Sequence, residues 1–143
     1  MTLLAAFQTL LHLYTKQSDI VVGTDIANRT REETERLIGF FVNLLALRTD
    51  LSGNPTFREL LKRVQKVTVE AYAHQDLPFE KLVASLHLER ELSRFPVFQA
   101  VLVLQNAPTP VLEITDLVLR PLPVENDTVK FDLIMFLMEG AGQ

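Results

Sequence analysis

The sequence predicts an α/β lobe in which a mixed sheet of about five strands packs against three to four helices. Several segments place apolar residues at the three- and four-residue steps of a helix, and apolar runs of strand length lie among them. The last third of the chain contains only strand-like runs separated by Pro, Asn and Asp. Because 143 residues are enough for one compact core and too few for two, we expect a single domain over residues 1–143.

The first two elements are expected to be a helix and a buried strand. Thr2 is in position to cap a helix whose apolar residues share one face, namely Leu3, Leu4, Phe7, Leu10, Leu11 and Tyr14. Residues 20–22 are consecutive and β-branched, which is typical of a strand covered on both faces. Asn28 follows this run and is expected to lie beyond the end of the strand.

The next two elements are expected to be a helix over 30–39 and a long strand over 40–49. Thr30 and Glu33 have the spacing of a capping box, and Gly39 is placed to end the helix. Nine of the ten positions in the strand are apolar, aromatic or able to sit in a sheet, and the exception is Asn43. Its carboxamide loses water on its donor and acceptor sides unless protein groups replace it. Two interpretations stay open, namely a hydrogen bond to a neighbouring loop and a polar group that lines a ligand passage.

The middle of the chain predicts two helices, and the remainder predicts strands. Thr56 and Glu59 repeat the capping-box spacing, and apolar residues continue at helical period to about Tyr72. Pro78 cannot sit inside a continuing helix but fits a first turn, so a short helix is expected to begin near Asp76. Three expected strands follow, at 97–105, 113–119 and 131–138.

Composition and charge exclude several classes of function. The formal charge is −4, from 14 basic and 18 acidic residues, so no positive field would attract nucleic acid or anionic lipid. The absence of cysteine excludes disulfides and thiolate chemistry, and it fits a cytoplasmic location. No apolar run is long enough to span a bilayer, so we expect no membrane partner.

Polar residues cluster at 74–76, where one expected helix ends and the next begins. The Asp76 carboxylate is placed to cap backbone amides, and the His74 imidazole is placed to bond locally. A catalytic role for His74 would require an orienting acid and a nucleophile within reach, and no serine or second histidine flanks it. The three histidines are far apart and lack metal-ligand spacing, so we predict no metal site.

Several segments, in their order and rough spacing, resemble the later signature motifs of the condensation domains of nonribosomal peptide synthetases. Residues 38–48 read IGFFVNLLALR and resemble the family's IGxFVNT-L-R segment. Residues 74–80 read HQDLPFE and resemble HQDxPFE, and residues 90–97 read RELSRFPV and resemble RDxSRNPL. Residues 19–29 look like the family's DIVVGTPIANR strand. Departures from the three signature motifs are the single residues Leu44, Glu91, Phe95 and Val97.

The resemblance implies the carboxy-terminal lobe of a V-shaped pair of chloramphenicol-acetyltransferase-like lobes, cut from a longer chain. It implies that a carrier-bound amine attacks a carrier-bound acyl thioester at the interface of the two lobes. The family's catalytic HHxxxDG motif belongs to the first lobe, and no adjacent histidine pair occurs here, so no catalytic residue is assigned and the chain is expected to be inactive alone. The implied tunnel-lining residue is Asn43, and the implied structural residues are Arg48, His74, Asp76 and Arg94.

The resemblance also implies partners, while no cofactor is expected to be bound by this lobe. Peptidyl or aminoacyl carrier domains would bring phosphopantetheine, and the missing first lobe would cover apolar surface, without which the fragment is expected to self-associate. Two alternatives stay open. One is a non-catalytic carrier-binding or docking module, and the other is a lobe of an epimerisation or heterocyclisation domain with the same fold. Phe-Val-Asn at 41–43 favours ordinary condensation.

Overall fold

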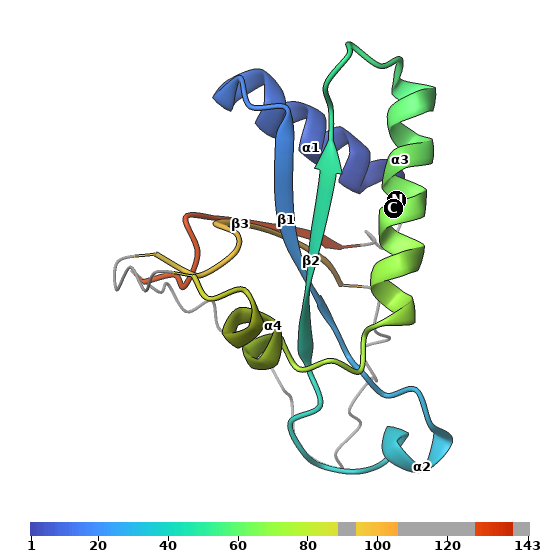
Figure 1. Cartoon of the computed structure of the whole chain (residues 1–143). Coiled ribbons are helices and arrows are strands. Elements are labelled where there is room, and N and C mark those ends of the chain that lie inside the picture. The colour runs from blue at the N-terminus through green and yellow to red at the C-terminus, as the bar shows by residue number, and fades with distance from the viewer. Residues whose placement is uncertain (89–93, 106–127, 139–143) are drawn as a thin grey trace, which may run out of the picture.

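The computed structural model describes residues 1–88, 94–105 and 128–138. Its helices are α1 (Thr2–Thr15), α2 (Glu32–Glu35), α3 (Phe57–Ala73) and α4 (Phe79–Ser85). Its strands are β1 (Asp19–Ile26), β2 (Asn43–Asp50), β3 (Ala100–Gln105) and β4 (Leu133–Met138) (Figure 1). The predicted α/β organisation is confirmed, and the predicted strand at 113–119 lies outside the described residues.

The four strands form one mixed sheet in the order β2-β1-β3-β4. The outer ladders are complete, since β1 pairs with β2 antiparallel and β3 pairs with β4 parallel along the whole of each strand. At the centre, β1 and β3 are parallel and pair at two positions, Val22 with Ala100 and Gly23 with Val101. We call these two residue pairs the seam. The sheet therefore consists of two full ladders joined by a short central contact.

Both faces of the sheet are covered because its strands alternate between two sets of apolar side chains. On one face, α1 and α3 pack on buried strand residues, among them Ile20, Val22, Leu45, Leu47 and Leu102. On the other face, Phe79 of α4 packs with Val101 and Val103, and Val21 joins this second cluster. The expectation that residues 20–22 form a strand covered on both faces is confirmed.

An aromatic cluster anchors the second face to the seam. Phe98 is almost completely buried, and its ring centroid lies 5.4 Å from that of Phe79, 5.3 Å from that of Phe95 and 5.9 Å from that of Phe131. Gly23 lies directly against this ring, because a Cβ at Gly23 would stand 2.2 Å from Cε2 of Phe98. The close approach of ring to strand therefore requires a residue without a side chain.

The predicted α3 is confirmed, including its cap. The Thr56 hydroxyl accepts from the backbone N of Glu59 at 3.3 Å, and the Glu59 carboxylate accepts from the backbone N of Thr56 at 2.8 Å. The short helix after Pro78 is also present, although it begins at Phe79, with Pro78 as its N-cap residue. In α1 the N-cap residue is Met1, so Thr2 lies inside the helix and does not cap it. No helix in the described ranges has the length and apolar character needed to cross a membrane.

The predicted helix over 30–39 is wrong in its extent. The structure has only the four-residue α2, with Arg31 at the N-cap position and no side-chain cap, so the Thr30 capping box is not formed. A helix of two or three turns gains most of its stability from packing an apolar face against the protein. Leu37 and Ile38 find no such surface, with 53% and 104% of their areas exposed, and the helix ends before them.

The predicted strand over 40–49 begins three residues later than expected. Asn43 is paired with Ile26, the last residue of β1, so residues 40–42 extend beyond the end of the neighbouring strand. Without a partner strand, their backbone groups cannot join a ladder. Phe40 accordingly projects into solvent, with 91% of its area exposed.

Candidate functional site

Beyond the seam, the parallel strands β1 and β3 separate, and a cleft opens at their carboxyl ends. The first residue past the seam on β1 is Thr24, whose hydroxyl donates to the carbonyl O of Leu102 at 2.9 Å. The cleft has a volume of about 510 Å³. Open α/β sheets bind ligands at the carboxyl ends of their parallel strands, so this cleft is the candidate functional site.

The cleft is walled by the ends of β1 and β3, the loop after β1, and the junction of α3 with α4. Its lining combines polar side chains with apolar ones, and it consists of residues 24–30, Val42, Tyr72, Gln75 and 103–105. Among these, Thr24, Gln75 and Gln105 supply hydroxyl and amide groups, while Val42 supplies apolar surface. A lining of this kind can hold a ligand that has both apolar and hydrogen-bonding groups.

Asn43 connects the first residue of β2 to the turn between α3 and α4. Its Nδ2 donates to the carbonyl O atoms of Gln75 and Leu77, each at 2.8 Å, and its Oδ1 accepts from the backbone N of Phe79 at 3.1 Å. Both amide hydrogens and the oxygen of the carboxamide are thus used. The lining of the cleft includes Val42 and Gln75 but not Asn43. Asn43 therefore holds two parts of the wall together, and its direct contact with a substrate stays a prediction.

Arg29 lies in the wall of the cleft, in the loop between β1 and β2. Its side chain contacts two other parts of the same loop. Its guanidinium carbon stands 4.3 Å from the ring centroid of Phe41. Its Nη1 donates to the carbonyl O atoms of Thr34 and Glu35 at the end of α2. An arginine over an aromatic face is attracted to the electron-rich ring, so Arg29 fastens this loop to the end of β1.

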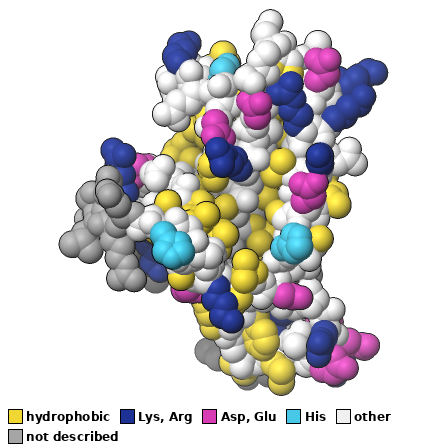
Figure 2. Space-filling model, viewed as in Figure 1, with side chains coloured by type: hydrophobic (Ala, Val, Ile, Leu, Met, Phe, Trp, Pro, Cys, Tyr) yellow, Lys and Arg dark blue, Asp and Glu magenta, His cyan; other side chains and the backbone are white. Residues whose placement is uncertain are grey.

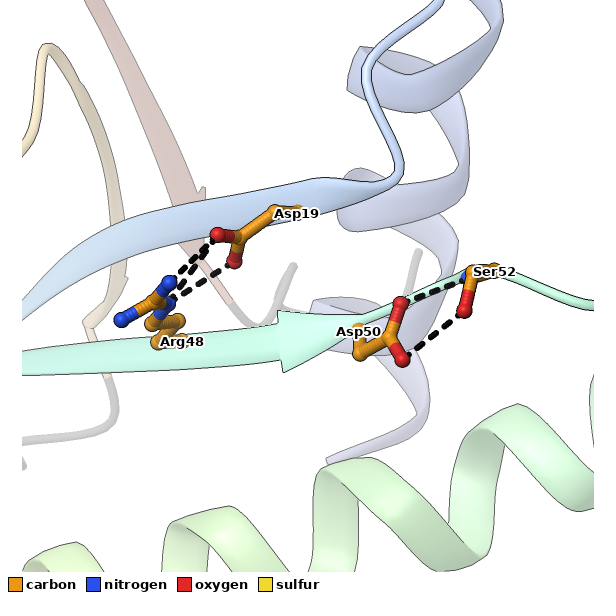
Figure 3. A network of polar contacts seen from close by, with 4 residues as sticks. All are labelled: Asp19, Arg48, Asp50 and Ser52. Carbon is orange, nitrogen blue, oxygen red and sulfur yellow. Dashed lines mark hydrogen bonds and ion pairs between the residues drawn. The ribbon is translucent and has the colours of Figure 1, made fainter.

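Arg48 lies outside the cleft, towards the opposite end of β2, where it pairs with Asp19 of β1 (Figure 3). Three hydrogen bonds join the guanidinium to the carboxylate, the shortest being Nη2 to Oδ2 at 2.6 Å. These hydrogen bonds lower the pKa of Asp19 from its ordinary value. Both side chains are more than half exposed, at 73% and 53%, and such a surface pair adds little to stability.

The remaining motif residues that the sequence singled out are all exposed, namely His74, Asp76 and Arg94. The backbone N of His74 donates to the carbonyl O of Ala71, so the main chain at His74 closes α3. Within the described ranges, neither the imidazole of His74 nor the carboxylate of Asp76 forms a hydrogen bond. The other residues of the Arg94 motif, 90–93, lie outside the described part of the chain. The structural roles expected for these side chains stay predictions.

Thr24, Arg29 and Gln105 line the cleft but were not singled out from the sequence. Thr24 and Arg29 belong to the family-like segment 19–29, which was the available signal, whereas nothing local marks Gln105. Among the residues that the structure describes, no group of three or more His, Asp or Glu side chains is arranged to hold a metal ion.

Comparisons with known proteins agree with the fold. A model of the family described as Condensation domain matches residues 1–143. One of the linear gramicidin synthase proteins of Brevibacillus parabrevis is 57% identical over 141 residues, which make up 97% of this chain and 2% of the synthase protein. The crystal structure of the X-domain from teicoplanin biosynthesis matches with a TM-score of 0.87 and 34% identity, covering 99% of this chain and 32% of that chain.

A solved complex of the X-domain and OxyB from teicoplanin biosynthesis matches with a TM-score of 0.82 and 36% identity. It covers 99% of this chain and 30% of that chain. The α/β lobe that the family resemblance implied is confirmed by these matches. The chain spans about a third of the solved structures and only 2% of the gramicidin synthase protein.

Proposed function

The chain belongs to the condensation domain family, and from this premise we propose that it serves as the carboxy-terminal lobe of an amide-forming domain. Residues 1–143 form this single lobe, and a first lobe outside the chain packs against it. A carrier-bound amine attacks a carrier-bound acyl thioester between the lobes. The amine nitrogen bonds to the acyl carbon, the sulfur of the donor arm leaves as a thiol or thiolate, and the amine gives up a proton.

The cleft between β1 and β3 is the observation that carries this proposal. A phosphopantetheine arm on a carrier domain is a linear chain of methylene and amide groups, and it brings the thioester or the amine to the site. Thr24, Gln75 and Gln105 would hydrogen-bond the amides, while Val42 would contact the methylene groups. Past the seam, the facing edges of β1 and β3 also carry backbone groups that no ladder between them uses.

We assign no proton-transfer step to a histidine of this lobe. A general base must lie within hydrogen-bonding reach of the proton that it accepts. The three histidines of the sequence are His12, His74 and His87, and none of them lines the cleft. The contribution of this lobe is to hold one carrier arm in position, which lowers the entropic cost of bringing the two substrates together. The proton of the amine would be accepted by the first lobe.

Asn43 would act on the cleft by fixing the position of its wall. Its carboxamide holds Gln75 in place from across the junction of α3 with α4, and Val42 precedes it in the chain. Direct contact with a substrate would require Asn43 to give up one of its three hydrogen bonds, or to accept a further one at Oδ1. In this proposal Arg48, His74, Asp76 and Arg94 are structural members of their motifs.

The first lobe would cover the apolar segment, which we define as residues 37–42. Leu37, Ile38, Phe40 and Val42 are all exposed there, by between 44% and 104% of their areas. Figure 2 shows hydrophobic side chains at the lower end of the molecule, beside the charged side chains around α2. An exposed group of large apolar side chains is typical of a surface that another protein part covers. Carrier domains are the other proposed partners, and they bring phosphopantetheine with them.

A docking module is a second candidate function. It is favoured by the similarity of the whole chain to the X-domain, which has been solved in complex with OxyB. In that case, the surface of the lobe would bind a partner protein and the cleft would hold no carrier arm. Affinities for carrier domains with and without the phosphopantetheine arm distinguish the two candidate functions. Only a cleft that holds the arm would bind the carrier with the arm more tightly.

The proposed function is tested with carrier domains loaded with an acyl donor and an amino acid acceptor. We expect amide product from the complete condensation domain that contains this chain, and none above the uncatalysed background from the chain alone. In the complete domain, Val42→Trp narrows the cleft and should raise the KM for the armed carrier. Val69→Trp on the exposed face of α3 is the matched control, because Val69 is outside the cleft.

Two results would contradict the proposal. The first is amide product from the chain alone at a rate above background. The second is an unchanged KM in the Val42→Trp domain, because a ligand that occupies the cleft must compete with the introduced indole. Equal affinity for carriers with and without the arm would instead favour the docking module.

A further inference from the structure

The position of the apolar segment is not explained by burial. Ile38 and Phe40 are almost completely exposed, yet Val42 at the end of the same segment lines the cleft. The segment is not part of either core cluster. Asn43, the residue after Val42, is fixed by its three hydrogen bonds and by its pairing with Ile26, so the remaining question is which contact sets the course of the residues before Val42.

Arg29 supplies that contact. It lies just after Asn28, whose φ of 51° turns the chain away from β1. From this point the guanidinium reaches the ring of Phe41, at 4.3 Å, and the carbonyl O atoms of Thr34 and Glu35. One side chain thus fastens both the end of α2 and the residue next to Val42 to the end of β1. We call this set of contacts the Arg29 clasp.

We propose that Arg29 is a positioning residue, whose clasp on Phe41 and on the end of α2 holds the chain before Val42. Because Asn43 holds the chain after Val42, the two residues together set the place of Val42 in the cleft wall. The effect of the clasp on amide formation rests on the proposed function, whereas its effect on the geometry of the segment does not. The guanidinium places its carbon over the ring while Nη1 reaches the carbonyl O atoms, and the single nitrogen of a lysine cannot occupy both positions, so lysine cannot replace it. A phenol ring, in contrast, can replace the phenyl ring of Phe41.

The geometric part of the proposal is tested in the chain alone. The sequence contains no cysteine, so Ile38→Cys and Lys66→Cys introduce two unique sites for spin labels. Ile38 lies in the apolar segment, and Lys66 lies on the exposed face of α3. Double electron–electron resonance should give a narrow distance distribution in the labelled chain. The distribution should broaden in Arg29→Gln, Arg29→Lys and Phe41→Leu chains and stay narrow in the Phe41→Tyr chain.

Arg36→Gln is the matched control. It removes the same charge from the same loop, and Arg36 has no side-chain hydrogen bond or aromatic contact within the described ranges. Its distance distribution should stay narrow. Because neither Arg29 nor Phe41 belongs to a core cluster, the melting temperature of each variant should stay close to that of the unmodified chain. A distribution in Arg29→Gln as narrow as in the control would overturn the proposal.

The functional part is tested in the complete condensation domain. Arg29→Gln should raise the KM for the armed carrier about two- to fivefold with an unchanged kcat, because a cation–π contact between half-buried side chains has at least about that effect on an equilibrium constant. Phe41→Tyr should keep the original KM. Broadened distances with an unchanged KM would overturn the positioning role and leave the proposed function intact. An unmodified domain that forms no amide would overturn the proposed function, while the clasp would still be measurable in the chain alone.

Discussion

At the scale of single residues, the polar side chains around the cleft bind the backbone more than they bind one another. Asn43 uses its whole carboxamide on main-chain groups of the turn between α3 and α4. Arg29 uses Nη1 on main-chain carbonyls at the end of α2. A side chain that satisfies backbone groups fixes a segment, and its removal leaves those groups without partners. These residues therefore act through placement and stability.

Asn43→Ala is expected to lower the free energy of unfolding of the chain by about 1–3 kcal/mol, because two carbonyls and one amide in a partly buried turn lose their partner. Urea denaturation measures the loss. Gln65→Ala on the exposed face of α3 is the control, and its effect should be small. Equal free energies of unfolding for the two variants would show that the three hydrogen bonds contribute nothing to stability.

The ion pair of Asp19 and Arg48 predicts that the stability of the chain falls in acid. Hydrogen bonds from Arg48 lower the pKa of Asp19 from its ordinary value of 3.8. A carboxylate with a lowered pKa in the folded state contributes stability that is present above pH 3.8 and is lost as the pH falls through the folded-state pKa. Arg48→Met should therefore bring the pKa of Asp19 back towards 3.8 in a titration followed by NMR.

Asp50 is the internal control for this titration. Its pKa is lowered by hydrogen bonds from the backbone N and the hydroxyl of Ser52, which Arg48→Met leaves in place (Figure 3). The pKa of Asp50 should thus stay low in the variant. If Asp19 titrates at the same pH with and without the guanidinium, then Arg48 is not the cause of its lowered pKa.

At the scale of elements, local signals predicted α3 and β1, because a capping box and a β-branched run act within a few residues. The extent of α2 and the start of β2 were not predictable in this way. They depend on whether a packing surface or a partner strand exists at residues 37–42. Asn43 stood out as a polar residue in an apolar run. The cleft could not be predicted from the sequence, because it forms where two segments almost 80 residues apart stop pairing.

Gly23→Ala is expected to destabilise the chain by about 1–3 kcal/mol, because the added methyl group enters space that the Phe98 ring occupies. The backbone φ of Gly23 is outside the left-handed region, so strain in the main chain is not the cause. Phe98→Leu is itself destabilising because the ring is buried, but Gly23→Ala should cost less in the Phe98→Leu chain than in the unmodified one. A double-mutant cycle measured by urea denaturation gives the coupling between the two sites, and a coupling of zero would contradict the steric explanation.

At the scale of the whole molecule, two buried clusters on opposite faces of one sheet coexist with large exposed apolar side chains. Besides the apolar segment, α1 exposes Leu3, Leu10, Leu13 and Tyr14, by between 41% and 82% of their areas. Leu3, Leu10 and Tyr14 were expected to share one face with Leu4 and Phe7, but they lie outward while Leu4 and Phe7 are buried. A helix that is apolar on both its inner and its outer side is typical of one covered by further protein. The chain thus has more apolar surface than its own fold covers.

Self-association at high concentration is the expected consequence, and sedimentation velocity measures it. The sedimentation coefficient should rise with concentration, and Ile38→Glu with Phe40→Glu should reduce that rise, because charges oppose the burial of the apolar segment. Lys62→Glu on α3 is the control for a change of charge alone. A strict monomer at every concentration would contradict the prediction.

Because the seam is short, few backbone hydrogen bonds fix the width of the cleft. Separating the two strands of either outer ladder breaks backbone hydrogen bonds along a whole strand. Within the described ranges, moving the free ends of β1 and β3 apart breaks one hydrogen bond between them, from the Thr24 hydroxyl to Leu102, because their ladder ends at Gly23. Side chains packed across both halves, such as Val22 with Leu102 and Val21 with Val103, supply the remaining resistance. The two halves of the sheet can thus rotate relative to each other about the seam. A bulkier ligand would be admitted by a sideways opening of the walls, which requires side chains between the halves to repack but leaves both outer ladders intact.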